Sequence, residues 1–460
     1  MTGWNRTEGD RLQLLQLNKR RGLLSALLIA ACLVFAVPAS AAETNYIVKY
    51  RDGGGAPFEV VSEAEMLRLR DAGLLEWYEP DRVLTLLEGE APTFYTEDKW
   101  DLTLINAEPA FRMGALGEGV KVGVLDSGVN PVPCLAGKLL PGQNYLTGEK
   151  EDNTADNYGH GTLVAALIAG KSEDGFLGAA PGAEIVPLKI TDGKGLMVST
   201  VCRAIYGGVD DYGCRVLNLS FGIREDSRAL REAVAHAAEQ DVVVVSAVGN
   251  SGTASRLYPA EYENTIGVGA VDKDGNVYYH SNHNGSVFLT APGAKVRTAG
   301  HRGGYTTATG TSFSVPLVSA AAAVLRGLDP RLTADEIAAI LKDTARDAGD
   351  AGWDEYYGWG VLDLGKSAAA ARERSRQDLP CMFTSAASIR NDSGTDVTAT
   401  YLLAAYDKDG TCLGVKSRTF PLPAGQTVQV EAPEENSFYG QFVYETATGR
   451  PLALARKSLE

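Results

Sequence analysis

Three short segments of the chain carry side chains that together could perform nucleophilic hydrolysis. They lie at 124–128, 159–162 and 310–316. In chain order they supply a carboxylate, Asp126, an imidazole, His160, and a hydroxyl, Ser312. An imidazole that is oriented by a carboxylate can take the proton of a serine hydroxyl, which makes that oxygen a nucleophile. We therefore expect acyl transfer at a carbonyl group, with these three residues as the catalytic set.

Each of the three side chains lies where a predicted element begins or ends. Asp126 closes an apolar strand, and His160 has a glycine on both sides just before a helix predicted over 162–169. Ser312 precedes a helix predicted over 314–328, and the first backbone N–H groups of such a helix stabilise a nearby oxyanion. Taken alone, each residue also suits an ordinary role as a turn cap, a structural histidine or a helix N-cap. The combination favours the catalytic interpretation.

Two further residues narrow the type of hydrolase. Ser314 stands where a G-x-S-x-G motif needs its second glycine, which disfavours an esterase of the α/β-hydrolase type. Asn250 follows an apolar strand predicted over 242–246. Its side-chain amide suits donation to the oxyanion that forms when a hydroxyl attacks a carbonyl, although an asparagine at this place also suits a plain turn. We include Asn250 in the candidate site as an oxyanion donor.

The composition is that of a large globular protein. The chain has 460 residues, of which 45% are hydrophobic and 22% are charged, so it is long enough for more than one domain. Its formal net charge of −15 disfavours nucleic acid as a partner, because phosphate binding needs a basic surface. We interpret the acidity as serving solubility.

The N-terminal residues predict export. A basic stretch at 19–21 precedes an apolar run over 22–37, and the small residues at 39–41 suit a cleavage site. This pattern predicts a signal peptide within 1–42. The alternative is an uncleaved anchor in the same range, which would be the only reason for contact with a membrane. We expect a secreted or extracytoplasmic protein, with association with the cell surface left open.

Cysteine pairing is left open by the sequence. Cys32 lies in the apolar N-terminal run, so a processed chain would keep five of the six cysteines, an odd number. The sequence contains no C-x-x-C motif, so it indicates neither a zinc site nor a redox site. The pairs Cys202–Cys214 and Cys381–Cys412 are candidates for disulfides in an exported protein.

Hydrophobic patterning divides the remaining chain into three folded regions. A strand, a capped helix from Ser62 and a second strand over 82–87 indicate a small α+β unit. From about 100 to 371, continuous apolar strands alternate with helices, which is typical of a parallel sheet covered on both faces. The charged run at 372–378 is predicted to be the solvated end of a helix and a linker. Period-two alternation after residue 379 then indicates a small antiparallel β domain, which we expect to be a sandwich.

The motifs around the catalytic set resemble those of the subtilisin-like serine proteases, or subtilases. The resemblance also covers framework segments at 258–262, 266–272, 291–293 and 357–360. It implies an α/β fold, with a mainly parallel sheet between helices, and the activity of a secreted serine endopeptidase of broad specificity. It implies that Ser312 is the nucleophile, that His160 moves the proton and that Asp126 orients the imidazole. Asn250 would join the Ser312 N–H in an oxyanion hole.

The same resemblance implies a precursor made of five parts. They are a signal peptide or anchor at 1–42, an inhibitor-like propeptide at 43–95, the catalytic domain at 96–371, the linker at 372–378 and the C-terminal β domain at 379–460. The protein's own propeptide is therefore an expected partner. We expect self-cleavage between about Leu87 and Thr96.

Substrate-binding residues are also implied by the resemblance. Subtilases hold the substrate as an extended strand between two protein segments. The matching residues are Ser220, Phe221 and Gly222 on one side, and Gly195 and Leu196 on the other. Leu257 aligns near the floor of the pocket for the P1 side chain, where we expect it to exclude the largest side chains. Leu163 replaces a histidine that many relatives carry outside the triad.

No cofactor is expected for catalysis, and structural calcium is left open. The loop Lys171–Asp174 offers few oxygen ligands, whereas calcium takes six to eight. The expected partners are protein or peptide substrates. The alternative to an enzyme is a catalytically silent protein with the subtilase fold that binds or inhibits. The presence of all four candidate residues disfavours that alternative.

Overall fold

The structure is a computed structural model of the chain. It describes residues 45–51, 57–86, 99–172, 175–377, 381–385, 388–392, 395–406, 412–430, 438–445 and 451–457. The chain divides into two compact units, of which the first ends at Asp81 and the second begins at Arg82. The predicted signal peptide or anchor, 1–42, lies outside the described residues.

The described part of the first unit is a three-stranded antiparallel sheet with one helix. Its elements are β1 (Asn45–Tyr50), β2 (Glu59–Ser62), α2 (Glu63–Asp71) and β3 (Leu75–Pro80), with the strand order β2-β1-β3. Ser62 caps α2, because its hydroxyl accepts a hydrogen bond from the Glu65 N–H at 3.3 Å. The predicted α+β content is therefore present. The strand predicted over 82–87 does not join this sheet, and it lies in the second unit as β4 (Val83–Leu86).

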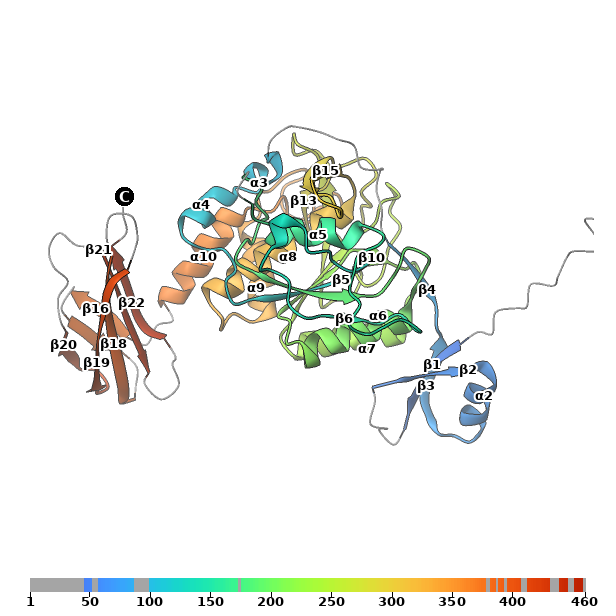
Figure 1. Ribbon diagram of the computed structural model, residues 1–460, viewed down its shortest axis with the longest axis horizontal. Coiled ribbons are helices and arrows are strands. Elements are labelled where there is room, and N and C mark those ends of the chain that lie inside the picture. Colours follow the sequence, from blue (N-terminus) through green and yellow to red (C-terminus); the bar gives the residue numbers. More distant parts are fainter. Residues whose placement is uncertain are drawn as a thin grey trace, which may run out of the picture. The chain divides into compact units, whose positions relative to one another are not determined.

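A parallel sheet of seven strands forms the centre of the second unit (Figure 1). The strand order is β13-β12-β11-β9-β5-β7-β6. The bounds are β5 (Lys121–Asp126), β6 (Gln143–Asn144), β7 (Glu184–Lys189), β9 (Val216–Leu219), β11 (Val243–Ala247), β12 (Thr265–Val271) and β13 (Leu289–Pro292). Most of their side chains are buried, as continuous apolar strands predict for a sheet that is covered on both faces.

Helices cover both faces of this sheet. They are α3 (Trp100–Leu104), α4 (Ala107–Arg112), α5 (His160–Ala169), α6 (Val198–Tyr206), α7 (Arg228–Glu239), α8 (Thr311–Leu328), α9 (Ala334–Thr344) and α10 (Leu364–Gln377). Helices α5 and α8 lie on one face, and α6 and α7 lie on the other (Figure 1). Among the described helices, α8 alone is long and apolar enough to cross a membrane. It is buried against β9, β11, β12 and β13, so its apolar surface serves the domain core.

Short elements complete the domain. They are the 3₁₀ turn η1 (Pro133–Leu135), the π turn η2 (Gly207–Asp211), the strands β8 (Leu196–Met197) and β10 (Phe221–Gly222), and the antiparallel pair β14 (Val296–Ala299) and β15 (Tyr305–Ala308). Strand β4 lies between β8 and β10 and pairs with both in the antiparallel sense. A strand from the predicted propeptide thus takes its hydrogen-bonding partners from the catalytic region.

Two predicted boundaries differ from the structure. Helix α8 begins at Thr311, so Ser312 is its second residue, and Gly310 is the N-cap in place of Ser312. Helix α10 continues to Gln377, so the predicted helix end extends through nearly all of the range 372–378, which is also predicted to hold the linker. The charged composition of that range reflects the end of a helix, where exposed polar side chains are expected.

The C-terminal region contains two antiparallel sheets, with strand orders β16-β17-β20 and β19-β18-β21-β22. The bounds are β16 (Cys381–Ser385), β17 (Ser388–Asn391), β18 (Val397–Tyr406), β19 (Cys412–Leu422), β20 (Thr427–Gln429), β21 (Phe438–Glu445) and β22 (Pro451–Lys457). Ile389 of the first sheet shares a buried cluster with Tyr401 and Phe420 of the second. Two sheets that share an apolar core form the predicted sandwich.

Candidate active site

Asp126 and His160 form a buried, hydrogen-bonded pair. Asp126 is the last residue of β5, and His160 is the first residue of α5. The imidazole Nδ1 lies 2.9 Å from Asp126 Oδ1 and 2.8 Å from Oδ2. An ionised carboxylate can only accept, so Nδ1 carries the proton and donates it. In the neutral ring this leaves Nε2 as the basic nitrogen.

Helix α8 brings Ser312 to the same place. The ring of Phe313, the next residue, lies 5.2 Å from the His160 ring, centroid to centroid. Helices α5 and α8 also pack against one another on one face of the sheet. Ser312 is fully buried and is the second residue of α8, so its backbone N–H lies in the first turn of the helix. This arrangement places a hydroxyl, an imidazole and the N-terminus of a helix near the carboxyl end of β5.

Asn250 lies beside the same helix end. Its Oδ1 accepts hydrogen bonds from the Thr311 N–H at 2.8 Å and from the Thr311 hydroxyl at 2.9 Å. A backbone N–H can only donate, so the atom that faces it must be the amide oxygen. The donor nitrogen of the amide therefore points away from Thr311. This orientation suits a side chain that donates to an oxyanion formed at Ser312.

Because Pro316 lies within α8, the Ser312 carbonyl is hydrogen-bonded to Ser220, one of the residues predicted to hold a substrate strand. Pro316 lies in α8 four residues after Ser312 and has no N–H, so the helix cannot satisfy the Ser312 carbonyl in the usual way. The Ser220 hydroxyl donates to that carbonyl at 3.0 Å instead. Ser220 Oγ in turn accepts from Asn218 Nδ2 at 3.1 Å. Ser312 is thus hydrogen-bonded to Ser220, the residue that precedes β10.

The residues predicted to hold a substrate strand lie on both sides of β4. Phe221 pairs with Leu86 and Gly222 with Thr85 on one side. Leu196 pairs with Leu84 on the other, and Gly195 directly precedes that strand. The Leu84 side chain is buried. An extended segment of this chain thus adds a strand between two edges, which is the geometry of β-augmentation.

Leu257 lies at the base of this edge. It is buried, and a Cβ atom at Gly222 would lie 3.1 Å from its Cβ. A Cβ atom at Gly249, the residue before Asn250, would lie 2.7 Å from Leu257 Cδ1. The leucine side chain therefore fills space between Gly222 and Gly249, the residue before the candidate oxyanion donor. Leu163 has a different place, because it is buried in the domain core.

Sequence reasoning missed Asp156 and gave Ser127 no role. Asp156 is buried in the loop before α5, and its Oδ1 accepts from the Ser127 hydroxyl at 2.8 Å. Ser127 follows Asp126, and its own N–H donates to Asp126 Oδ1 at 2.8 Å. The available signal was an aspartate four residues before a helix-starting histidine. Such an aspartate reads as an ordinary cap until its partners are known.

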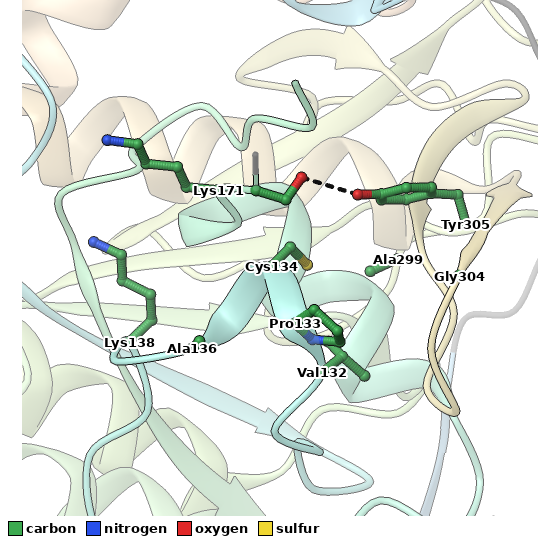
Figure 2. Close-up of a pocket in the computed structure, with 10 residues that line it drawn as sticks. Val132, Pro133, Cys134, Ala136, Lys138, Lys171, Ala299, Gly304 and Tyr305 are labelled. Carbon is green, nitrogen blue, oxygen red and sulfur yellow. Dashed lines mark hydrogen bonds between the residues drawn. The ribbon is translucent and has the colours of Figure 1, made fainter. Parts of the chain in front are cut away.

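A separate pocket of about 740 Å³ lies beside the loop considered for calcium. Figure 2 shows Lys138 and Lys171 extending on one side of it and Tyr305 on the other. The Ser172 hydroxyl is hydrogen-bonded to the Tyr305 hydroxyl at 2.9 Å. Two ammonium groups repel a cation, and calcium requires oxygen ligands. Glu173 and Asp174 lie outside the described residues. Among those that the structure describes, no cluster of three His, Cys, Asp or Glu side chains could hold a metal.

One suggested disulfide is absent. Cys202 and Cys214 are both buried thiols that do not pair with each other, and Cys134 is likewise a buried thiol. Burial raises the pKa of the Cys214 thiol to about 12, which keeps it protonated and unreactive. The side chains of Cys381 and Cys412 lie outside the described residues.

Comparison with known proteins gives a consistent set of matches. A family model described as "Subtilase family" matches residues 117–360, just over half of the chain, and that range includes all four candidate catalytic residues. Subtilisin BL of Lederbergia lenta is 36% identical over 267 residues, which cover 57% of this chain and 96% of the relative. An alkaline protease of Alkalihalobacillus alcalophilus is 34% identical over 278 residues, covering 60% and 71%. Alkaline elastase YaB of Bacillus sp. strain YaB is 31% identical over 265 residues, covering 57% and 68%.

Proposed function

This chain belongs to the subtilase family and is a serine endopeptidase, and we propose that Asp126, His160 and Ser312 are its catalytic triad. The observation that carries the assignment is the Asp126–His160 pair, which faces the first turn of the helix that holds Ser312. Asn250 is the proposed side-chain donor of the oxyanion hole, together with the Ser312 N–H. The supporting reason is chemical, because a held imidazole, a buried hydroxyl and an anion-stabilising helix end suit acyl transfer.

The proposed reaction has two halves. His160 Nε2 takes the proton of the Ser312 hydroxyl as its oxygen attacks the peptide carbonyl carbon. The resulting oxyanion accepts hydrogen bonds from Asn250 and from the Ser312 N–H, and the imidazolium then gives its proton to the leaving amine. Water repeats the sequence on the acyl-enzyme and releases the acid. Asp126 keeps Nδ1 protonated and stabilises the imidazolium throughout.

Labelling with a fluorophosphonate probe tests the assignment. We expect wild-type protein to react covalently at Ser312 and to degrade an unfolded protein substrate. Ser312→Ala removes the labelled atom, and His160→Ala removes the base, so both variants should lose the label and the activity. Label that persists in Ser312→Ala, at the same peptide, would contradict the assignment of the nucleophile.

We further propose that substrates bind as β4 does, as an antiparallel strand between Gly222 on one side and Leu196 on the other. Main-chain pairing of this kind reads the backbone and tolerates many side chains, so we expect broad specificity. Leu257 supports one restriction, because it fills space at the base of this edge. A peptide panel that varies only P1 should show poor cleavage after Phe and Tyr, with Leu257→Gly restoring it. Strong wild-type preference for Phe or Tyr would contradict this role.

Self-processing follows from the same placement. Strand β4 ends at Leu86, whose partner Phe221 adjoins Ser220, and Ser220 is bonded to the Ser312 carbonyl. We therefore propose that the chain cleaves itself at the start of the predicted interval from Leu87 to Thr96. Mass spectrometry of wild type should show a new N-terminus in this interval. The Ser312→Ala variant should retain the longer chain, and identical N-termini in the two proteins would refute self-cleavage.

Export and calcium are two further proposals. The basic and apolar N-terminal residues support secretion, and the proposal predicts mature protein outside the cell, without residues 1–42. We propose that structural calcium, left open by the sequence, does not bind at the Lys171 loop, where two lysine side chains line the pocket. Removal of calcium with a chelator should then change the unfolding free energy of Lys171→Ala and of wild type by the same amount.

A further inference from the structure

A buried carboxylate, Asp156, organises the start of helix α5. Asp156 is 2% exposed, and its two oxygens accept four hydrogen bonds. Oδ1 accepts from the Gly159 N–H at 2.6 Å and from the Ser127 hydroxyl at 2.8 Å. Oδ2 accepts from the Thr162 N–H at 2.9 Å and from the Thr162 hydroxyl at 2.5 Å. A carboxylate with this many donors is held in one orientation.

These bonds fix the backbone on both sides of His160. Gly159 and Thr162 donate to Asp156 directly, and the Gly161 N–H donates to Ser127 Oγ at 3.0 Å. Ser127 therefore accepts from one side of the helix start and donates to Asp156. Because the Ser127 N–H also bonds to Asp126, a single network holds both partners of the Asp126–His160 pair. A small error in imidazole placement is costly, since about 1 Å of misplacement can lower the rate roughly 10²-fold.

The charges around His160 come from several elements. Asp126 faces it from β5, and Asp156 lies in the loop before α5. Lys189 lies on β7, opposite Asp126 in the strand register. Its buried ammonium donates a hydrogen bond to the Ala155 carbonyl at 2.7 Å. The His301 ring lies against Gly159, where a Cβ atom would come 2.7 Å from His301 Nδ1. The two carboxylates and the one ammonium together leave a net negative charge around the imidazole.

We propose that Asp156 is a positioning residue for His160 and that its negative charge also favours the imidazolium formed during proton transfer. The inference rests on the proposed function, because it assigns His160 as the base. It separates two contributions, since the hydrogen bonds fix the geometry of α5 and the charge shifts the protonation of the ring. Ser127 also helps to fix the geometry of α5 through its hydrogen bonds, but it carries no charge that would act on the imidazole.

Steady-state kinetics across pH, with a small peptide substrate, test the proposal. Each variant is matured by a trace of tagged wild-type enzyme, which is then removed, and active sites are counted with the fluorophosphonate probe. Asp156→Asn should lower kcat about 10- to 100-fold with little change in KM, because misplacement acts on the chemical step. Its acidic limb in the profile of kcat/KM should move to lower pH, because a negative charge that favours the imidazolium is lost.

Three further variants separate geometry from charge. Ser127→Ala should lower kcat without moving the acidic limb. Lys189→Met removes the opposing charge and should move the limb to higher pH, and it provides this test if Asp156→Asn does not fold. Asp152 is exposed in the same loop, so Asp152→Asn is the matched control and should change neither quantity.

Two outcomes would overturn the inference. Wild-type rates in Asp156→Asn would remove the positioning role. An acidic limb that stays in place in both Asp156→Asn and Lys189→Met would remove the electrostatic role. Failure of the proposed function itself looks different, because wild-type enzyme would then carry no label at Ser312.

Discussion

The starts of helices α5 and α8 have similar local structure but different electrostatic surroundings, one with a charged partner and one with a neutral partner. Each helix begins after a glycine N-cap with positive φ, 112° at Gly159 and 138° at Gly310. Glycine has no side chain with which to cap the helix, so partners must come from elsewhere in the fold. The partner at α5 is the carboxylate of Asp156, and at α8 it is the neutral amide of Asn250.

The difference matches the charge that each helix end must stabilise. A helix N-terminus carries a partial positive charge, which would oppose an imidazolium at His160. A buried carboxylate beside α5 offsets it. The same positive end is useful at Ser312, where we propose that an oxyanion forms, and a carboxylate there would repel that oxyanion. A glycine-capped helix start can therefore suit either a cation or an anion, and the residue that packs against it from elsewhere in the fold sets which charge it favours.

The largest effect is expected from placing a negative charge at α8. Asn250→Ala removes the proposed oxyanion donor, and loss of one such donor typically lowers kcat roughly 10²- to 10³-fold. Asn250→Asp has nearly the same shape but would put a carboxylate where the oxyanion forms, so its kcat should fall further than that of Asn250→Ala. Measurement of kcat at alkaline pH, with active sites counted by titration, checks this order. Equal rates in the two variants would contradict the electrostatic distinction between the helix starts.

A smaller effect is expected from the link between Ser220 and Ser312. Ser220→Ala removes the hydroxyl that donates to the Ser312 carbonyl, at a cost of about 1 kcal/mol or roughly fivefold in kcat/KM. Pro316→Ala restores an N–H four residues after Ser312, which can bond that carbonyl within the helix. A double-mutant cycle should therefore show that Ser220→Ala costs less in the Pro316→Ala background. Equal costs in both backgrounds would mean that the hydroxyl bond does not support the nucleophile.

A third helix start, that of α3, is expected to affect activity least. Its buried carboxylate, Asp101, should instead make the stability of the protein depend on pH. Asp101 is buried in the first turn of α3, and burial raises its pKa to about 6, although backbone hydrogen bonds and Lys99 oppose the shift. The folded state therefore holds the proton more tightly than the unfolded chain, whose pKa is near 3.8. The stability that this group contributes is present below about pH 4 and is lost as pH rises through 6.

Asp101→Asn tests that assignment in the inactive Ser312→Ala background, which prevents self-digestion. The variant and its parent should have similar unfolding free energies near pH 4. The variant should gain up to about 2–3 kcal/mol by pH 7, because it has no buried charge to desolvate. Denaturant unfolding at several pH values measures the difference. A gap that stays constant with pH would show that Asp101 does not titrate in this window.

Local patterns in the sequence predicted the framework and the chemistry. Apolar strands that alternate with helices predicted the parallel sheet, and the glycine-flanked His160 and the strand-ending Asp126 were found at the element ends where the sequence placed them. The framework motifs led to the family before any contact was known. These features depend on hydrophobic period and on residue type at fixed spacing, which a single chain displays directly.

Contacts between distant residues were decided only by the tertiary structure. The sequence contains Asp156 and Ser220, but nothing in it says that one meets the start of α5 or that the other replaces a hydrogen bond that Pro316 removes. It suggested a Cys202–Cys214 disulfide that is absent. Sequence alone predicted the residues of the candidate triad and their order along the chain, because residue types and spacing are read directly from it. The fold decided their charges, partners and orientation, because hydrogen bonds and desolvation depend on which groups the packed chain brings within a few ångströms.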